Sequence, residues 1–236
     1  MITAETRLVA LLGQPVRESL SPRMQNAAFA ARGLDWAYVA CEVAPDRFRE
    51  ALQGLVALGF VGANVTSPHK QEAARLADEA EDASVNTLVF GNGRVVGRNT
   101  DKAIVARVTG ERVCLIGAGG AAQALLSALP GEVRVFSRSG EWPPDASCAD
   151  VIVNATPVRD ELIVEPHAGQ TVVDLAYYAD GRATALVEAA RAAGCEVVDG
   201  LEALVRQGAA SFELWTGVAP PLDVMRAAVR SSRCWS

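Results

Sequence analysis

The sequence predicts an α/β protein with parallel sheets, and three observations support this prediction. Short apolar runs alternate with segments of helical character through most of the 236 residues. Half of the residues are hydrophobic, which is enough for a buried core in one large domain or two small ones. A glycine-rich turn lies directly between one apolar run and one helical segment, as in a repeated βα unit with right-handed crossovers.

The first half of the chain contains predicted strands at Arg7–Gly13, Trp36–Val43 and Gly62–Val65, and a hairpin over Val85–Val96 with its turn at Gly91–Gly93. Predicted helices run from Pro22 to about Ala31, over Pro45–Leu58, and onward from about His69. Ser21 precedes Pro22 and is the predicted N-cap of the first helix.

The second half continues the alternation of strands and helices. Its predicted strands are Arg112–Ile116, Glu132–Phe136, Ala149–Asn154, Thr171–Leu175 and Glu196–Val198. Its predicted helices are Ala121–Leu129, Thr184–Ala193 and Leu201–Leu214. Domain boundaries are expected near residues 98 and 205, where helices rather than flexible linkers join the two parts.

Composition argues against several classes of partner. The formal net charge is −6 and the basic residues form no run or stripe, so neither nucleic acid nor an anionic membrane surface is expected to bind. The stretch Val113–Pro130 is apolar enough to raise the question of a membrane span. Gly117, Gly119 and Gly120 would break such a helix, so a strand, a turn and a helix explain this stretch better.

The cysteines and histidines predict neither disulfides nor a metal site. The cysteines are odd in number, scattered and never form a CxxC, which suits a reducing cytoplasm. They are Cys41, Cys114, Cys148, Cys195 and Cys234. The two histidines, His69 and His167, lack ligand spacing and partners, so no metal is expected.

A glycine motif in the second half predicts a dinucleotide site. Gly117, Ala118, Gly119, Gly120, Ala121 and Ala122 form a G-x-G-x-x-A between a strand and a helix. In such a turn Gly117 allows the tight bend, Gly119 lets the backbone approach a pyrophosphate, and Ala122 lets the helix pack on the strand. A glycine turn that holds no ligand is the alternative, and the strand–turn–helix context favours nucleotide binding.

The end of the next strand indicates which dinucleotide binds. An NAD site usually places an acid there to hold the ribose 2′-OH. Here the strand ends in Ser137-Arg138-Ser139, and the Arg138 guanidinium suits a 2′-phosphate. The sequence therefore predicts NADP, with NAD less favoured.

Polar residues gather at the ends of predicted elements in the first half. Asn64, Thr66 and Lys70 follow an apolar strand, and Ser19 and Ser21 at a helix start suit a small carboxylate. The other members of the set are Asn86-Thr87 and Asn99-Thr100-Asp101. Each alone is explained by capping or a turn, but together they predict a pocket for a ligand rich in hydroxyl groups.

Lys70 is a candidate acid–base group. The chain has 20 arginines and only two lysines, Lys70 and Lys102. A lysine amine can lose its proton near neutral pH, whereas a guanidinium stays protonated. Asp101 could hold the Lys70 ammonium and share its proton traffic. An ordinary solvated lysine is the alternative reading of Lys70.

These motifs, taken in order, resemble the shikimate dehydrogenase family over nearly the whole chain. The opening motif runs from Gly13 to Phe29 and the closing run from Gly200 to Gly217. The motifs between them are Asn64–Lys70, Val85–Leu88, Gly97–Asp101, Gly117–Ala122, Asn154–Pro157 and Asp174–Tyr177. Eight ordered motifs make coincidence implausible.

The resemblance implies a role for each matched residue. Lys70 and Asp101 would be the catalytic pair, and Ser19 and Ser21 would bind the substrate carboxylate with help from Tyr177. Ring hydroxyls would be bound by Thr66, Asn86, Asp101 and Gln207. Cofactor contacts would come from the glycine motif, Ser137, Arg138, Thr156, Leu175 and Gly200. The reaction would be NADPH-dependent reduction of 3-dehydroshikimate to shikimate, a step of aromatic amino acid biosynthesis.

The resemblance also implies the domain organisation. Residues 1–98 with 208–236 would form an α/β substrate-binding catalytic domain, and residues 99–207 a Rossmann-like NADP-binding domain. The C-terminal helices would pack back on the first domain, and the cleft between the domains would hold the chemistry. Oligomeric state is not readable from the sequence.

Several positions depart from the family pattern. The family usually has His at Glu18 and Gln25, and Gly at Lys102 and Arg159. Glu141 stands where the family's cofactor motif has a second basic residue. The stretch between Asp101 and Arg112, and the regions between the later strands, are also short. These departures concern the cofactor more than the substrate. The alternatives are therefore a quinate or aminoshikimate dehydrogenase, for which NAD is a candidate cofactor, and a catalytically weak ligand-binding relative.

Overall fold

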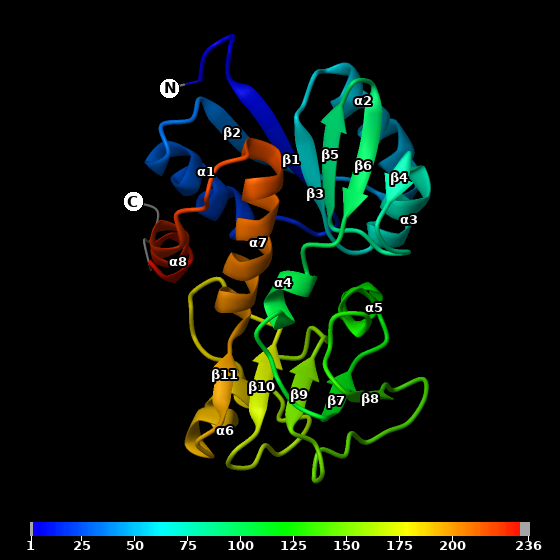
Figure 1. The fold of residues 1–236 in the computed structure, drawn as a ribbon, viewed down its shortest axis with the longest axis vertical. Helices are drawn as coiled ribbons and strands as arrows, with labels where there is room; N and C mark the ends of the chain where they lie inside the picture. Colours follow the sequence, from blue (N-terminus) through cyan, green and yellow to red (C-terminus); the bar gives the residue numbers. More distant parts are fainter. Residues whose placement is uncertain (1, 232–236) are drawn as a thin grey trace. The chain divides into compact units, whose positions relative to one another are not determined.

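The computed structural model describes residues 2–231, which form two compact units (Figure 1). The first unit comprises residues 2–100 and 207–229, and the second comprises residues 101–206 and 230–231. Asn99, Thr100 and Gln207 thus belong to the first unit and Arg230 to the second, which corrects the predicted limits. Thr100 bonds to Asn86 within the first unit, and Arg230 bonds to Asp199 within the second. Cys234, with the rest of the predicted C-terminal stretch 232–236, lies outside the described residues.

The first unit is built on a mixed six-stranded sheet with the order β2-β1-β3-β5-β6-β4. β1 pairs parallel with both β2 and β3, and β5 pairs antiparallel with β3 and β6. The predicted hairpin is therefore confirmed, with Asn92 and Gly93 at positive φ in its turn. The strands are β1 (Arg7–Gly13), β2 (Trp36–Glu42), β3 (Gly62–Val65), β4 (Glu79–Ala80), β5 (Thr87–Gly91) and β6 (Arg94–Arg98).

Helices cover both faces of this sheet because its strands are apolar on both sides. Phe48 and Leu52 of α2 pack with Leu12 and Leu88 on one face. On the other, Phe29 of α1 stacks on Phe212 of α7 with ring centroids 5.4 Å apart. The helical elements with residues in this unit are α1 (Ser21–Ala31), η1 (Pro45–Arg47), α2 (Phe48–Ala57), α3 (Lys70–Leu76), α7 (Gly200–Thr216) and α8 (Leu222–Arg230).

The start of α1 differs from the prediction. Leu20 occupies the N-cap position, and Ser21 is the first helical residue. The Ser21 N–H donates to Ser19 Oγ at 3.2 Å, so Ser19 is the hydroxyl that serves the helix start. Pro22 then falls at the second helical position, where a missing N–H costs nothing.

The second unit has a fully parallel sheet with the order β11-β10-β9-β7-β8. Its strands are β7 (Arg112–Ile116), β8 (Glu132–Phe136), β9 (Val151–Asn154), β10 (Thr171–Asp174) and β11 (Glu196–Val198). Its helices are α4 (Lys102–Val105), α5 (Gly120–Leu126), α6 (Ala185–Ala192) and the first part of α7. The strands at the centre of the sheet carry buried residues throughout, as expected when both faces are covered.

This second sheet is contracted relative to the doubly wound pattern, whose strand order is 3-2-1-4-5-6. With β7 as the first strand, β8 occupies the second position and is an edge, so no counterpart of the third strand is present among the described residues. The segments 137–150 and 155–170 contain no helix. Loop residues such as Ala146 and Val164 take over part of the packing beside α6.

Two elements, β4 and α4, were not predicted, and α8 was implied only as one of the C-terminal helices, without bounds. β4 and α4 have two and four residues, too few for a periodic pattern to show. The apolar stretch 113–130 folds as β7, a turn and α5, as predicted, although α5 ends at Leu126 rather than Leu129. No helix within residues 2–231 is long and apolar enough to cross a membrane.

Candidate active site

A network of buried polar side chains lies at the centre of the first unit. Asn64 lies in β3, and its side-chain amide donates to Thr87 Oγ1 and Ser211 Oγ, each at 3.0 Å. Its carbonyl oxygen accepts from the Tyr38 hydroxyl at 2.8 Å. Thr87 Oγ1 in turn lies 2.9 Å from Thr100 Oγ1. All five groups are nine-tenths buried or more, so the network links β2, β3, β5, the end of β6 and α7.

This network fixes the orientation of Asn86, a predicted substrate-binding residue. The Asn86 side-chain oxygen accepts from the Thr100 N–H at 2.8 Å and from Thr100 Oγ1 at 3.0 Å. Its amide nitrogen is therefore turned toward Gln207, whose Oε1 accepts at 3.4 Å. The structure thus brings together two of the predicted substrate-binding residues, one directly before β5 and the other on α7. Asn64, Thr87 and Thr100 belong to the predicted polar pocket, although none had an individual ligand role, and Tyr38 and Ser211 were not predicted to take part.

The other predicted residues of the first unit sit at the starts of helices. Lys70 is half-buried and is the first residue of α3, after the loop that carries Thr66. The Thr66 N–H donates to Leu12 O at 2.9 Å, which ties this loop to the end of β1. His69, which precedes Lys70, is buried, bonds through Nε2 to Val43 O at 2.8 Å, and stacks on Phe48. His69 therefore has a structural setting that positions the start of α3.

Ser21 is buried and lies one turn before Gln25 on α1. The Gln25 side-chain amide donates to Gly208 O at 2.8 Å, so it joins α1 to the residue after Gln207 on α7. Gln25 Oε1 has no hydrogen-bond partner among the described residues. Gln25 thus links the segments that carry the predicted carboxylate and hydroxyl ligands.

In the second unit, Asp101 is buried and occupies the N-cap position of α4. Tyr177 is half-buried and follows β10 by three residues. Lys70 belongs to the first unit, and Asp101 and Tyr177 belong to the second.

The glycine motif adopts the strand–turn–helix arrangement that a dinucleotide site needs. Gly117 begins the turn after β7 with φ 119°, and a Cβ there would press on the backbone of Ala155. Ala118 and Gly119 are exposed, and a Cβ on Gly119 would meet open space, so a ligand can approach the backbone. Ala122 is buried against the core of the unit. Gly120 and Ala121 form the start of α5 and are half-buried.

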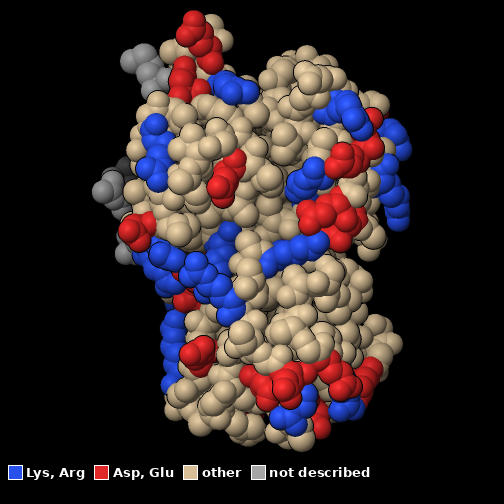
Figure 2. Space-filling view, in the orientation of Figure 1, with Lys and Arg blue, Asp and Glu red and all other residues tan. Residues whose placement is uncertain are grey.

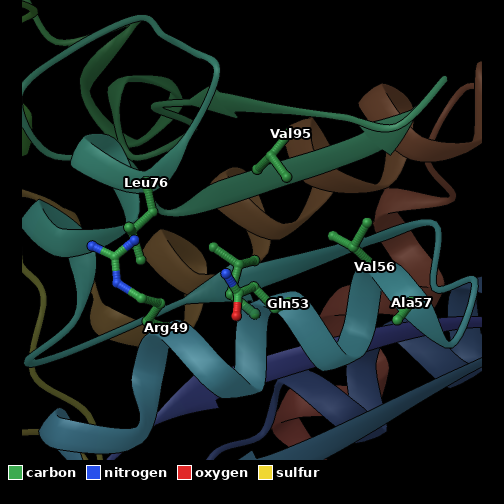
Figure 3. A pocket seen from close by; sticks show the side chains of 7 residues that line it. Arg49, Gln53, Val56, Ala57, Leu76 and Val95 are labelled. Atoms are coloured by element: carbon green, nitrogen blue, oxygen red, sulfur yellow. The ribbon is translucent and has the colours of Figure 1, made fainter.

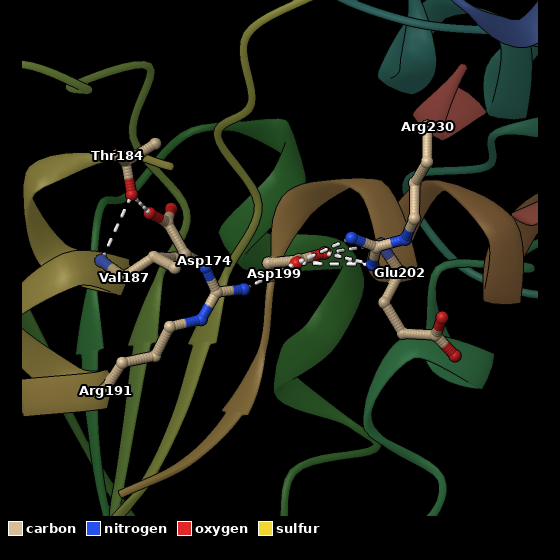
Figure 4. A network of polar contacts seen from close by, with 7 residues as sticks. All are labelled: Asp174, Thr184, Val187, Arg191, Asp199, Glu202 and Arg230. Atoms are coloured by element: carbon tan, nitrogen blue, oxygen red, sulfur yellow. Dashed lines mark hydrogen bonds and ion pairs between the residues drawn. The ribbon is translucent and has the colours of Figure 1, made fainter. Parts of the chain in front are cut away.

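Asn154 and Asp174 hold the loops after β9 and β10 (Figure 4 shows Asp174 and its Thr184 partner). The Asn154 amide donates to Asp174 Oδ1 at 2.9 Å, and Asn154 Oδ1 accepts from Thr156 Oγ1 at 2.7 Å. Asp174 also accepts from the Ala176 N–H at 3.0 Å. Burial raises the pKa of Asp174 although these hydrogen bonds oppose the shift. The loops carrying Thr156 and Leu175, two predicted cofactor ligands, are thereby fixed.

The start of α7 is held by a second cluster in the same view. Asp199 accepts from Arg191 and from Arg230, both at 3.0 Å, and from the Glu202 N–H at 2.9 Å (Figure 4). The next residue, Gly200, is a predicted cofactor ligand. A Cβ on Gly200 would overlap Ala176 O, so only glycine allows this close approach to the loop after β10.

Arg159, which departs from the family pattern, is held by an aromatic ring. Its guanidinium lies over Tyr178 at 5.4 Å, and Arg182 lies over the same ring at 3.5 Å. The Tyr178 hydroxyl also bonds to Asp160. These contacts hold Arg159 at Tyr178, within the loop that follows Thr156.

The first unit also has a surface pocket whose lining includes no residue of this polar network. A shallow pocket of about 280 Å³ is lined mainly by apolar side chains of α2, α3 and β6, including Leu52, Val56 and Val95 (Figure 3). None of the predicted site residues lines it, so we do not assign the substrate there. Nearby, basic and acidic side chains alternate over α3, β4 and β6 (Figure 2), with the Arg98–Glu79 pair at 2.8 Å.

No group of three or more potential metal ligands occurs within residues 2–231.

A mixed α/β unit with preset amide and hydroxyl groups, and a parallel unit with a dinucleotide-type turn, define a two-domain α/β protein of the kind that acts on a small polar molecule. Residues 11–88 match the shikimate dehydrogenase substrate binding domain, and residues 200–230 match the shikimate 5′-dehydrogenase C-terminal domain. The chain is 34% identical to the shikimate dehydrogenase (NADP(+)) of Methanocaldococcus jannaschii, over 97% of this chain and 98% of that protein. The chain belongs to the shikimate dehydrogenase family.

Two solved structures are similar to the model. One is a shikimate dehydrogenase in complex with NADP+, with a TM-score of 0.88, 32% identity, and coverage of 97% of this chain and 96% of that one. The other is the shikimate 5-dehydrogenase of Thermus thermophilus in complex with NADP(H) and shikimate, with a TM-score of 0.81, 32% identity, and coverage of 95% and 99%. The predicted fold class, a substrate domain with a Rossmann-like domain, is confirmed.

The comparison also measures the contraction. The alignment with the Methanocaldococcus protein extends over 278 positions, whereas this chain has 236 residues. At least 42 of the aligned positions therefore have no residue in this chain. The helix-free segments after β8 and β9 are consistent with such shortening.

Proposed function

We propose that this protein is an NADP-dependent shikimate dehydrogenase, which reversibly reduces 3-dehydroshikimate to shikimate. The observation that carries the proposal is family membership over 97% of the chain, with relatives of that name and activity. The buried network around Asn86 supports it, because fixed amide and hydroxyl groups suit a ligand rich in hydroxyls.

In this proposal Lys70 and Asp101 are the catalytic pair. When bound in the second unit, NADPH would supply the hydride for the C3 carbonyl carbon of 3-dehydroshikimate. Lys70 gives its proton to the carbonyl oxygen as the alcohol forms and regains one from solvent, while Asp101 orients the Lys70 amine. The reverse reaction uses neutral Lys70 as the base.

The remaining predicted residues bind and orient. Ser19 and Ser21 hold the substrate carboxylate, with Tyr177 at the same end. Thr66, Asn86, Asp101 and Gln207 hold the ring hydroxyls. Because Thr100 occupies the Asn86 carbonyl, the Asn86 amide is presented as a donor without reorganisation.

The second unit fits a dinucleotide. Residues 117–122 form the turn after β7 and the start of α5. Ser137 and Arg138 follow β8, where a 2′-phosphate would lie. Thr156, Leu175 and Gly200 lie on the loops after β9 and β10 and at the start of α7, and they complete the proposed cofactor ligands.

We place the enzyme in the cytoplasm, in aromatic amino acid biosynthesis. Cys41, Cys114, Cys148 and Cys195 have free thiols, and burial raises the pKa of Cys114 to about 12, which makes its thiolate scarce. The absence of disulfides among the described cysteines suits a reducing compartment.

The test is an absorbance assay at the nicotinamide band, with shikimate or quinate as substrate and NADP+ or NAD+ as cofactor. The proposal requires shikimate with NADP+ to give the highest kcat/KM of the four combinations. A higher kcat/KM with quinate, or no turnover with any combination, contradicts it.

A further inference from the structure

The segment that carries Arg138 closes into a small turn at the end of β8. The Ser137 N–H donates to Glu141 O at 3.0 Å, and the Gly140 N–H donates to Ser137 O at 3.0 Å. The Ser137 and Ser139 hydroxyl oxygens lie 3.3 Å apart. Arg138 therefore projects from a turn whose backbone bonds are internal, at an exposed edge of the sheet.

The acid in this turn is paired with an arginine of the strand. Arg134 on β8 bonds Glu141 through both Nε, at 3.2 Å, and Nη2. The same guanidinium lies over the Phe136 ring at 5.0 Å. The hydrogen bond to Glu141 raises the pKa of Arg134. Arg134 thus offsets the negative charge of Glu141. Glu141 is the residue for which the family resemblance implies a basic side chain.

The tip of the turn is held by an aromatic ring. The Arg138 guanidinium lies 5.7 Å from the centre of the Trp142 ring, within the range of a cation–π contact. Trp142 is 40% exposed, so one part of its surface faces the solvent. An arginine over a ring loses fewer conformations on binding a phosphate than a free one does.

We propose that Arg134 and Trp142 determine the cofactor preference through Arg138. Arg134 neutralises Glu141, so that the turn does not repel a phosphate, and Trp142 holds the Arg138 guanidinium ready to pair with it. This inference rests on the proposed NADP-dependent function and names two positioning residues for it. The pair replaces the second basic residue that this chain lacks.

The test measures nucleotide binding rather than turnover. Isothermal titration of the full-length protein compares adenosine 2′,5′-bisphosphate with adenosine 5′-monophosphate, which differ by the 2′-phosphate. Arg134→Ala should lower the preference for the bisphosphate roughly two- to fivefold, the range of exposed ion pairs. The double variant Arg134→Ala, Glu141→Gln should recover the wild-type preference, because no unpaired acid remains.

Trp142 is tested with two substitutions. Trp142→Leu should lower the preference roughly two- to fivefold, as expected for an exposed cation–π contact. Trp142→Phe should retain most of it. The matched control is Arg112→Ala, which breaks an exposed pair with Asp150 at 3.1 Å at the other end of β7 and should leave the preference unchanged.

The outcomes separate this inference from the proposed function. A wild-type protein that binds both nucleotides equally overturns the NADP assignment and this inference with it. A normal wild-type preference that Arg134→Ala does not reduce, or that the double variant does not recover, overturns the role of Arg134 alone. A Trp142→Leu variant that weakens both nucleotides equally shows that Trp142 contacts the adenine, which overturns its role through Arg138.

Discussion

The two units prepare their polar groups in different ways. The first unit presets Asn86 with bonds from a network whose members are almost entirely buried. The second unit presents Arg138 on an exposed turn at a sheet edge, supported by the exposed Arg134–Glu141 pair. Buried hydrogen bonds resist both water and salt, whereas exposed ion pairs are screened. We therefore expect the substrate site to tolerate changes of salt better than the cofactor site.

The difference also relates to where the chain has been shortened. The helix-free segments lie in the second unit, and β8 has become an edge strand. A short turn with internal hydrogen bonds can hold one guanidinium there, but it offers no buried neighbours to a second. The substrate unit has no comparable freedom, because its network ties several elements together.

The largest effect on activity is expected from substitution of Lys70. This substitution tests whether the polar network alone can support catalysis. Lys70→Ala should lower kcat roughly 10²- to 10⁴-fold, the worth of a positioned acid–base group, with a much smaller change in the KM for shikimate. Lys70→Arg should fail too, because a guanidinium does not give up its proton. Steady-state kinetics provide the measurement, with Arg75→Ala on the exposed side of α3 as the control. An alanine variant with near wild-type turnover removes Lys70 from the mechanism.

The next effect concerns the buried network itself. Asn64→Leu keeps the volume but leaves the hydroxyls of Tyr38, Thr87 and Ser211 without their shared partner. Thr87 and Ser211 keep their contact with each other at 2.8 Å, so we expect the free energy of unfolding to fall by about 1–3 kcal/mol, the cost of the buried hydrogen bonds that are lost. Urea denaturation measures it. Arg134→Ala, in the exposed pair, should leave the midpoint unchanged; equal losses in both variants would erase the contrast between the units.

A smaller effect tests the exposed cofactor turn. Arg138→Ala should remove most of an NADP preference over NAD that we expect to be roughly tenfold or more, since a bond to a charged phosphate exceeds a neutral one. The preference should also decline with added salt, because Arg138 is exposed. The ratio of kcat/KM for the two cofactors decides the point. If the variant keeps its preference, another residue recognises the 2′-phosphate.

The bounds of several strands were predicted correctly, because apolar segments and turn residues alternate regularly along the chain. β1, β3, β7, β8 and β11 have the predicted bounds. In each of these short segments, apolar residues predominate or alternate with polar ones. The family resemblance supplied roles for Ser19, Asn86 and Lys70, which remain predictions. The sequence could not reveal the network around Asn64, because its partners come from residues as distant as Ser211 and only tertiary packing brings them together.

Other features depended on local competition that a pattern does not resolve. Ser21 was the predicted N-cap, but Leu20 takes that position and the Ser19 hydroxyl accepts the Ser21 N–H instead. The pairing of Glu141 with Arg134 was also not foreseen, although both residues are near the end of β8. A residue seven positions away is readable as a partner only once the turn between them is known.

The smallest effect is expected on the pH dependence of stability, and it concerns Asp174. This buried group of the second unit shows that buried polar groups are not confined to the first unit. Burial raises the pKa of Asp174, so the native state holds this proton more tightly than the unfolded chain does. The resulting stability is fully present below the unfolded pKa, near 3.9, and is lost as the pH rises through the raised native pKa. In Asp174→Asn this loss is absent.

The free energy of unfolding of Asp174→Asn minus that of wild type should therefore rise with pH, by a modest amount, when urea denaturation is repeated between about pH 3 and pH 7. Asp150→Asn gives the opposite control. The hydrogen bond from Arg112 lowers the pKa of Asp150, so wild type gains stability as the pH rises and that difference should fall. If the Asp174→Asn difference also falls, the bonds from Asn154, Ala176 and Thr184 outweigh burial, and Asp174 is an ionised anchor of the loops that carry the proposed cofactor ligands.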